Sequence, residues 1–148
     1  MEVKSAKIVN VINQLFEYSN HYIEIRNDIN LRIPAFSVIE KNIYGRFVPY
    51  ILINPEIIPD DINIISHILA HEWGHHISKH LKPLDVQEIM KLKPESKDDI
   101  QKKENEADAY AAIFINKKSL NKDIIISFIK KYSPYDSENR IRILNMKK

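Results

Sequence analysis

Histidine is concentrated in one short segment near the middle of this chain. Five of the six histidines lie between His67 and His80, where isoleucine and leucine recur at helical spacing. That spacing predicts a helix over about 61–81, with Asp60 or Asp61 as its N-cap. The segment constrains the fold more than any other, because several imidazoles must share one helix with a set of apolar positions.

Two kinds of hydrophobic pattern occupy the rest of the chain. Helical spacing predicts a helix over about 5–19 and several helices after the histidine segment, whereas alternation and short apolar runs predict strands only before it. The predicted strands include residues 23–25, 36–38 and 50–53, with a turn at 42–46; the later helices are 84–92, 98–117, 124–132 and 137–144, with an exposed loop at 93–99. Because strands come early and helices late, the predicted class is α+β.

The composition is typical of a globular protein. The 148 residues are 44% hydrophobic and 28% charged, and we expect one domain over residues 1–148. The lack of cysteine excludes a disulfide framework, a thiolate metal site and a cysteine nucleophile. A formal net charge of +2 gives no reason to expect direct nucleic-acid binding. No apolar run approaches the ~18 residues of a membrane span and the N-terminus lacks the apolar core of a signal peptide, so we expect a cytoplasmic protein without membrane contact.

The segment His71-Glu72-Trp73-Gly74-His75 matches the pattern H-E-x-x-H on the predicted helix. Residues at positions i and i+4 lie one turn apart on one face, so the His71 and His75 imidazoles can reach a single Zn²⁺. The Glu72 carboxylate can take a proton from a water molecule held by the metal, while the metal polarises a substrate carbonyl. The pattern therefore predicts a hydrolytic zinc site with Glu72 as general base. The alternative is a surface helix that happens to be rich in histidine.

A catalytic zinc site usually has a third protein ligand and keeps one position open. Glu104 and Asp108 lie one turn apart on the helix predicted from about residue 98, and Ala107 and Ala111 offer small side chains for close helix packing. One carboxylate can bind the metal while that of the next turn accepts the free N–H of a ligand histidine and so fixes its tautomer and orientation. The alternative is that both, with Glu106, form a solvated acidic face.

Together these two segments resemble the gluzincin pattern H-E-x-x-H followed by E-x-x-A-[N/D], at residues 71–75 and 104–108. The chain is similar to the ImmA/IrrE family of small cytoplasmic metallopeptidases, in which a strand and Asn-Pro precede the zinc helix, as residues 50–55 do here. The resemblance extends over about residues 50–114. It therefore covers the predicted site and the segments on either side of it.

The resemblance implies a zincin-like domain, in which an N-terminal helix and a small sheet are followed by the zinc-binding helix and further helices. It implies Zn²⁺ as the cofactor, bound by His71, His75 and Glu104, with Glu72 as the general base. This leaves Asp108 as the carboxylate that orients a ligand histidine. It also implies a hydrolase that cleaves a protein or peptide, often a helix-turn-helix repressor of a phage or mobile element.

A second resemblance is to the HtpX-like family, whose signatures read H-E-x-x-H-x-x-x-x-H and H-P…R-I. Residues 71–80 have the first spacing and residues 133–141 resemble the second, with Ser133 where that family has histidine. The chain shows no apolar run long enough for the transmembrane helices of that family. Asp108 in turn departs from the ImmA/IrrE pattern, which more often has asparagine there. Either family implies the same zinc site.

Several further residues receive expected roles. His80 is expected to end or cap the helix, and His67 is expected to be a surface histidine with a bound partner. Trp73 is expected in the core or a groove. Gly74 is expected to allow close backbone packing, because glycine inside a helix costs roughly 1 kcal/mol relative to alanine. The candidates for stabilising an oxyanion, among which the sequence does not choose, are Tyr110, Tyr132 and Arg140.

The predicted function is that of a zinc-dependent metalloendopeptidase, with a sheet edge that could bind an extended peptide by strand addition. A second hypothesis is a zinc-binding module without catalysis that holds a protein partner. Glu72 favours the enzyme, because a purely structural site has no use for a base beside its metal. A third hypothesis is a structural zinc site closed by His80 or a carboxylate as a fourth ligand, which would prevent catalysis.

Overall fold

The computed structural model describes residues 3–81 and 95–146 and has an α+β fold. The first half contains helix α1 (Lys4–Ser19) and strands β1 (Glu24–Asn27), β2 (Ala35–Lys41) and β3 (Phe47–Ile53). The helices that follow in the described residues are α2 (Ile62–Ile77), α4 (Lys97–Lys117), α5 (Lys122–Tyr132) and α6 (Ser137–Leu144). The predicted fold class is confirmed, and the predicted helix over 84–92 lies outside the described residues.

The strands form one sheet in the order β1-β3-β2, in which β1 is parallel and β2 antiparallel to β3. Among the strands of the described residues, none pairs with the outer edge of β2. The hairpin turn that joins β2 to β3 lies where the sequence predicts it, with Gly45 at φ 76°, a conformation that favours glycine. The alternation predicted for β2 is incomplete: Phe36 is half exposed, whereas Ser37 and Val38 are both buried. Helix α2 packs against β2 and covers the Ser37 side.

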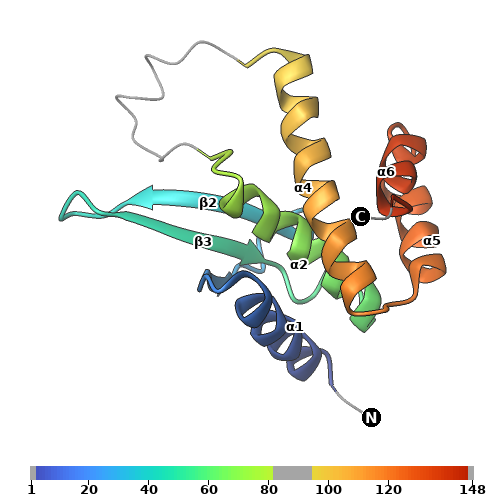
Figure 1. Ribbon diagram of the computed structural model, residues 1–148. Helices are drawn as coiled ribbons and strands as arrows, with labels where there is room; N and C mark the ends of the chain where they lie inside the picture. Colours follow the sequence, from blue (N-terminus) through green and yellow to red (C-terminus); the bar gives the residue numbers. More distant parts are fainter. Residues whose placement is uncertain (1–2, 82–94, 147–148) are drawn as a thin grey trace.

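Helix α2 is the central element of the fold. It contacts the sheet on one side and α4 on the other, and it also packs against α1 and α5 (Figure 1). Asp61 is its N-cap, because the Asp61 carboxylate accepts hydrogen bonds from the backbone N–H groups of Asn63 and Ile64. Asp60, the other predicted N-cap, instead forms an ion pair with Lys7. Trp73 is fully buried, as expected, and its indole N–H donates to the Ser19 hydroxyl at 2.9 Å.

The C-terminal end of α2 differs from the prediction. The helix ends at Ile77 rather than near residue 81, because Lys79 adopts a left-handed conformation with φ 57°. The chain then turns back, and the backbone N–H of His80 donates to the carbonyl of His75 at 3.0 Å. Helix α4 begins at Lys97 with Ser96 as its N-cap, so the loop predicted over 93–99 ends at residue 96, three residues earlier, and residues 93–94 of it lie outside the described residues.

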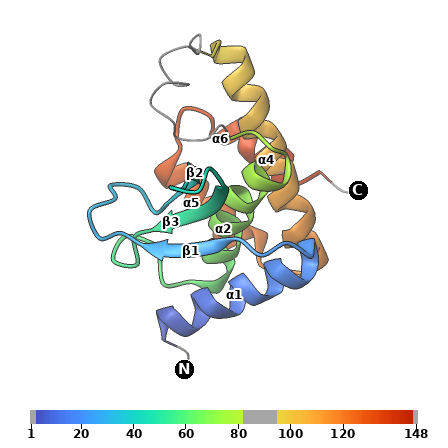
Figure 2. The same ribbon diagram turned by 90° about the vertical axis from the view of Figure 1, so that its left-hand side faces the viewer.

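Gly74 allows the close approach of α2 and α4. A Cβ atom at this position would lie 3.0 Å from the Cβ of Tyr110 and 3.1 Å from the Cα of Ala107. Only a residue without a side chain leaves room for that contact, as the sequence predicts. Helix α6 packs against α4 and α5 beyond this crossing, so that α2 lies between the sheet and the C-terminal helices (Figure 2). The crossing brings the part of α4 that carries Glu104 and Asp108 beside the histidines of α2.

Candidate metal centre

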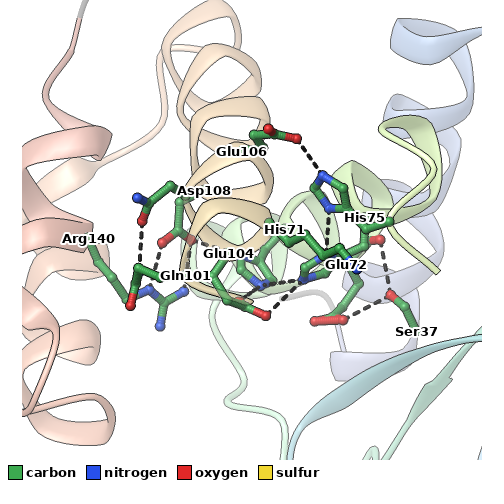
Figure 3. A network of polar contacts seen from close by, with 12 residues as sticks. Ser37, His71, Glu72, His75, Gln101, Glu104, Glu106, Asp108 and Arg140 are labelled. Carbon is green, nitrogen blue, oxygen red and sulfur yellow. Dashed lines mark hydrogen bonds and ion pairs between the residues drawn. The ribbon is translucent and has the colours of Figure 1, made fainter. Parts of the chain in front are cut away.

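His71, His75 and Glu104 meet between α2 and α4 (Figure 3). The Nε2 atom of His71 lies 2.9 Å from Glu104 Oε2, and the Nε2 atom of His75 lies 3.3 Å from Glu104 Oε1. The two Nε2 atoms lie 3.2 Å apart. All three predicted ligands therefore present one donor atom each to the same small volume, and the group could hold a metal ion.

The spacing of these atoms fits a tetrahedral metal ion. Two nitrogen atoms bound at about 2.0–2.1 Å to one ion at the tetrahedral angle lie about 3.3 Å apart. The observed separation of 3.2 Å is close to that value. Each imidazole reaches this volume through Nε2, which leaves Nδ1 free for a contact behind the ring. His71 and His75 are each 8% exposed, so most bulk water is excluded from the donor atoms.

His71 is held from behind by a buried carboxylate. Its Nδ1 atom lies 2.8 Å from Asp108 Oδ1, the contact that the sequence predicts for the carboxylate one turn after Glu104. Asp108 is 3% exposed and accepts two hydrogen bonds from the Arg140 guanidinium, at 3.0 and 3.1 Å. A third nitrogen of Arg140 donates to the Ser133 hydroxyl at 2.9 Å. The partly buried guanidinium of Arg140 gives aspartate, rather than asparagine, a physical role at position 108.

The electrostatics of this group follow from burial and ion pairing. Burial acts to lower the pKa of His71, but hydrogen bonds to Asp108 and Glu104 outweigh it and raise the pKa to about 10. Burial acts to raise the pKa of Asp108, whereas the contacts with His71 and Arg140 lower it to about 2. The pKa of Glu104 is also lowered, because the hydrogen bonds to the two histidines outweigh its desolvation.

His75 is held by a different arrangement, which sequence reasoning missed. Its Nδ1 atom lies 3.0 Å from Nδ1 of His80, and Nε2 of His80 contacts the carboxylate of Glu106. The Glu106 side chain is 45% exposed. His80 therefore neither extends the helix nor joins the donor atoms of the metal group. The left-handed turn at Lys79 is what places it against His75.

Glu72 is fixed by a residue of the sheet. The Ser37 hydroxyl lies 2.9 Å from Glu72 Oε1 and 3.0 Å from the Glu72 backbone oxygen, so its proton is shared between the two acceptors (Figure 3). Burial raises the pKa of Glu72, and the neighbouring histidines only partly offset this. A carboxylate with a raised pKa is a stronger base than one in water. Nothing in the spacing of the sequence links Ser37 to this site.

Two hollows open beside the metal group. One has a volume of about 470 Å³ and extends toward α5 and α6; the other has a volume of about 390 Å³ and extends along the first half of α4. His71 and Glu72 line both, as do Ile33 and Ala35 at the start of β2. A ligand that runs along β2 can therefore occupy both hollows and pass the metal group between them.

The remaining candidate residues lie in three settings. Tyr132 and Arg140 line the larger hollow, whereas Tyr110 packs against Tyr18 in the interior with ring centroids 5.7 Å apart. The expectation for His67 is wrong: it is 2% exposed, and neither ring nitrogen has a hydrogen-bond partner among the described residues. The helical spacing shows that His67 and His71 share one face of α2. It does not show that residues of α5 and of the segment before β2 lie over this face and reduce the exposure of His67.

Comparisons with known proteins found no match: no family model, curated protein or solved structure matches the chain. Within residues 3–81 and 95–146, none of the helices combines the length and apolar character needed to cross a membrane.

Proposed function

We propose that this protein is a zinc-dependent endopeptidase, and one observation carries the proposal. The Glu72 carboxylate lies beside a group of two imidazoles and one carboxylate, and both face the same pair of hollows. Two histidines and a glutamate are a known donor set of catalytic zinc sites, which keep one position open. A metal site with only a structural role would gain nothing from a buried base at that place.

The donor set favours zinc among the common metal ions. Imidazole nitrogen suits zinc and other transition metals, whereas calcium and magnesium prefer an all-oxygen environment. His71, His75 and Glu104 would hold the ion. When bound, zinc supplies a polarised water molecule of lowered pKa and a positive charge that attracts a substrate carbonyl oxygen.

The residues of the chain have distinct tasks in this proposal. Glu72 accepts a proton at its carboxylate and can return it to the leaving amine, and Ser37 holds that carboxylate in place. Asp108 and His80 orient the two imidazoles through their Nδ1 atoms. The outer edge of β2 offers backbone hydrogen-bonding groups to an extended peptide.

The resemblance to the ImmA/IrrE family supports a narrower proposal. The spacing of H-E-x-x-H and E-x-x-A-D fits that family, and in the structure its two parts meet at one site. On this basis the substrate is a cytoplasmic protein, and a helix-turn-helix repressor of a phage or mobile element is the first to test. Ser133 and Arg140, two residues of the segment that resembles the second HtpX-like signature, are joined by a hydrogen bond.

Elemental analysis of the purified protein, with Glu104→Ala beside the wild type, tests the metal site. We expect about one zinc per chain in the wild type and much less in the variant. Zinc that the substitution leaves unchanged would rule out Glu104 as a ligand, and wild-type protein that takes up no zinc would overturn the proposal.

Cleavage of a mixed peptide library by the zinc-loaded protein tests the activity. Glu72→Gln should keep the metal and lose turnover by a factor of several hundred or more, because it removes only the base. Ser37→Ala is the matched control, since it removes a contact to the same carboxylate and should reduce turnover far less. A Glu72→Gln protein that keeps its zinc and cleaves as the wild type does would show that the site is not a peptidase of this kind.

A further inference from the structure

His67 makes no hydrogen bond to the protein in the part of the chain that the structure describes. It lies one turn before His71 on α2 and is 2% exposed, yet its ring nitrogens are not among the enclosed polar atoms that lack a partner, which are His76 Nδ1 and the Tyr110 hydroxyl. The His67 imidazole lines the larger hollow beside the metal group, so its ring nitrogens are accessible from that hollow. A group bound in the hollow can therefore supply the hydrogen bond that His67 does not receive from the protein.

The walls of this hollow are mainly apolar and partly aromatic. Phe128 and Tyr132 lie one turn apart on α5 with ring centroids 4.6 Å apart. The other apolar side chains of the lining come from α2 and from the segments before and after the sheet hairpin: Ile33, Pro34, Ala35, Ile57, Pro59 and Ile68. A volume of about 470 Å³ is within the range of pockets that bind small organic groups. The hollow is therefore suited to an aromatic ring.

The charged residues that line the hollow are Glu72 at the metal group, Arg140 beside His67, and the exposed Arg32. The Arg140 guanidinium forms an ion pair with Asp108, so its positive charge is already neutralised. Burial lowers the pKa of His67 to about 3, which leaves a neutral imidazole with one N–H donor and one nitrogen acceptor. A charged side chain placed next to His67 would lose its hydration without gaining an opposite charge there, because the neighbouring Arg140 is already paired and Arg32 is exposed. An aliphatic side chain would leave His67 without a hydrogen bond.

We propose that this hollow is the specificity pocket of the site, and that it takes a substrate side chain with an aromatic body and a neutral hydroxyl tip, which among the standard residues is tyrosine. The inference rests on the proposed function for its substrate, but the pocket itself requires neither metal nor turnover. The ring packs between Phe128 and the apolar wall, and the hydroxyl pairs with the ring nitrogen of His67. Because His71 and Glu72 line the same hollow, the tyrosine lies next to the peptide bond that is cleaved.

Titration of the full-length, ¹⁵N-labelled protein with p-cresol and with toluene tests the pocket by NMR. The first probe has the ring and hydroxyl of tyrosine, and the second has the same ring without the hydroxyl. We expect p-cresol to shift the amide signals around His67 and Phe128. The preference for p-cresol over toluene should fall about fivefold in His67→Leu, as expected for the loss of one neutral hydrogen bond.

The variants separate the pocket from general effects on folding. His67→Leu should unfold at the same temperature as the wild type or higher, because it removes an unpaired polar group. His21→Leu, at an exposed histidine, should leave both titrations unchanged. Phe128→Ala should weaken p-cresol and toluene by a similar factor, and this variant decides the location of the pocket if His67→Leu does not fold. Shifts that map elsewhere, or a preference that is the same in wild type and His67→Leu, would overturn the inference.

A second measurement distinguishes this inference from the proposed function. In the peptide library, cleavage products of the zinc-loaded protein should be enriched in tyrosine at one position next to the cut, and His67→Leu should shift that preference toward phenylalanine. Cleavage without tyrosine enrichment would remove the pocket and leave the peptidase. Absence of zinc and of cleavage would remove the peptidase, while the p-cresol titration would still decide whether the pocket exists.

Discussion

The two histidines of the candidate metal centre are supported in opposite ways. Behind His71 stand the buried Asp108 and the partly buried Arg140, which form an ion pair between α4 and α6. Behind His75 stand His80 and Glu106, a chain of contacts that ends at an exposed carboxylate. Both arrangements occupy the Nδ1 atom of the imidazole and leave Nε2 directed at the metal group. The two arrangements differ in burial, and therefore in how much each contributes to the stability of the fold.

The difference shows that orienting a ligand and stabilising a fold are separate tasks here. Removing one partner of a buried ion pair leaves an uncompensated charge in the interior, which is strongly destabilising. Removing one partner of an exposed pair changes stability little, because water replaces it. We therefore expect the His71 support to affect both folding and metal binding, and the His75 support to affect mainly metal binding.

The largest effect is expected for Asp108→Asn. Asparagine leaves the partly buried Arg140 charge without its carboxylate, so we expect a loss of about 3 kcal/mol in the free energy of unfolding, measured with urea. Zinc affinity, measured by competition with a chelator, should fall about 10–100-fold. In the double variant Asp108→Asn, Arg140→Met, much of the stability should return but not the zinc affinity. Recovery of both would contradict a direct role of Asp108 in orienting His71.

The pH dependence of stability should depend on whether metal is present. In protein stripped of metal, the raised pKa of His71 contributes stability that is fully present below its ordinary pKa of 6.5 and is lost as the pH rises toward 10. The free energy of unfolding should therefore fall by a few kcal/mol between pH 6.5 and 10. In the zinc-loaded protein the imidazole is unprotonated throughout, so this loss should be absent. Equal slopes in urea melts of the two forms would show that His71 is not a ligand.

A moderate effect is expected for His80→Ala. His75 then loses the contact behind its ring, and zinc affinity should fall about tenfold, at the lower end of the range for groups that orient a metal ligand. The free energy of unfolding should fall by about 1–2 kcal/mol, less than for Asp108→Asn, because the His80 side chain is 6% exposed whereas its partner Glu106 is 45% exposed. A loss of stability as large as that of Asp108→Asn would show that the two supports are equivalent after all.

The smallest effect is expected for Glu106→Gln. Its carboxylate is largely in water, so we expect a change of less than about 0.5 kcal/mol in stability and less than threefold in zinc affinity. Salt provides a further check, because an exposed pair is screened while a buried one is not. Raising the ionic strength should therefore remove the effect of Glu106→Gln and leave that of Asp108→Asn unchanged.

The local part of the site could be predicted from the sequence, and the tertiary part could not. His71 and His75 share a helix, so the period of the helix alone brings them together. Glu104 required a crossing of two helices, and Gly74 with the small residues of α4 gave a signal for it. The same reasoning gave the Asp108 contact.

The contacts that were missed have physical reasons. Arg140 reaches Asp108 only because α6 packs on α4, and Ser37 reaches Glu72 across the interface of sheet and helix. His80 was assigned to a helix end, but a left-handed residue turned it back onto His75. His67 was placed on the surface because the spacing of a helix shows which residues share a face and not what covers that face.

The contact between Ser37 and Glu72 bears on where a substrate is cut. Ser37 belongs to β2, the strand whose outer edge would carry the peptide, and its hydroxyl also steadies the base. The substrate and the base would thus take their alignment from one strand. A change of register between β2 and β3 would move the peptide relative to the metal without touching any ligand. Substitutions in the distant hairpin should accordingly alter the choice of bond, and so the fidelity of the enzyme, before they alter its rate.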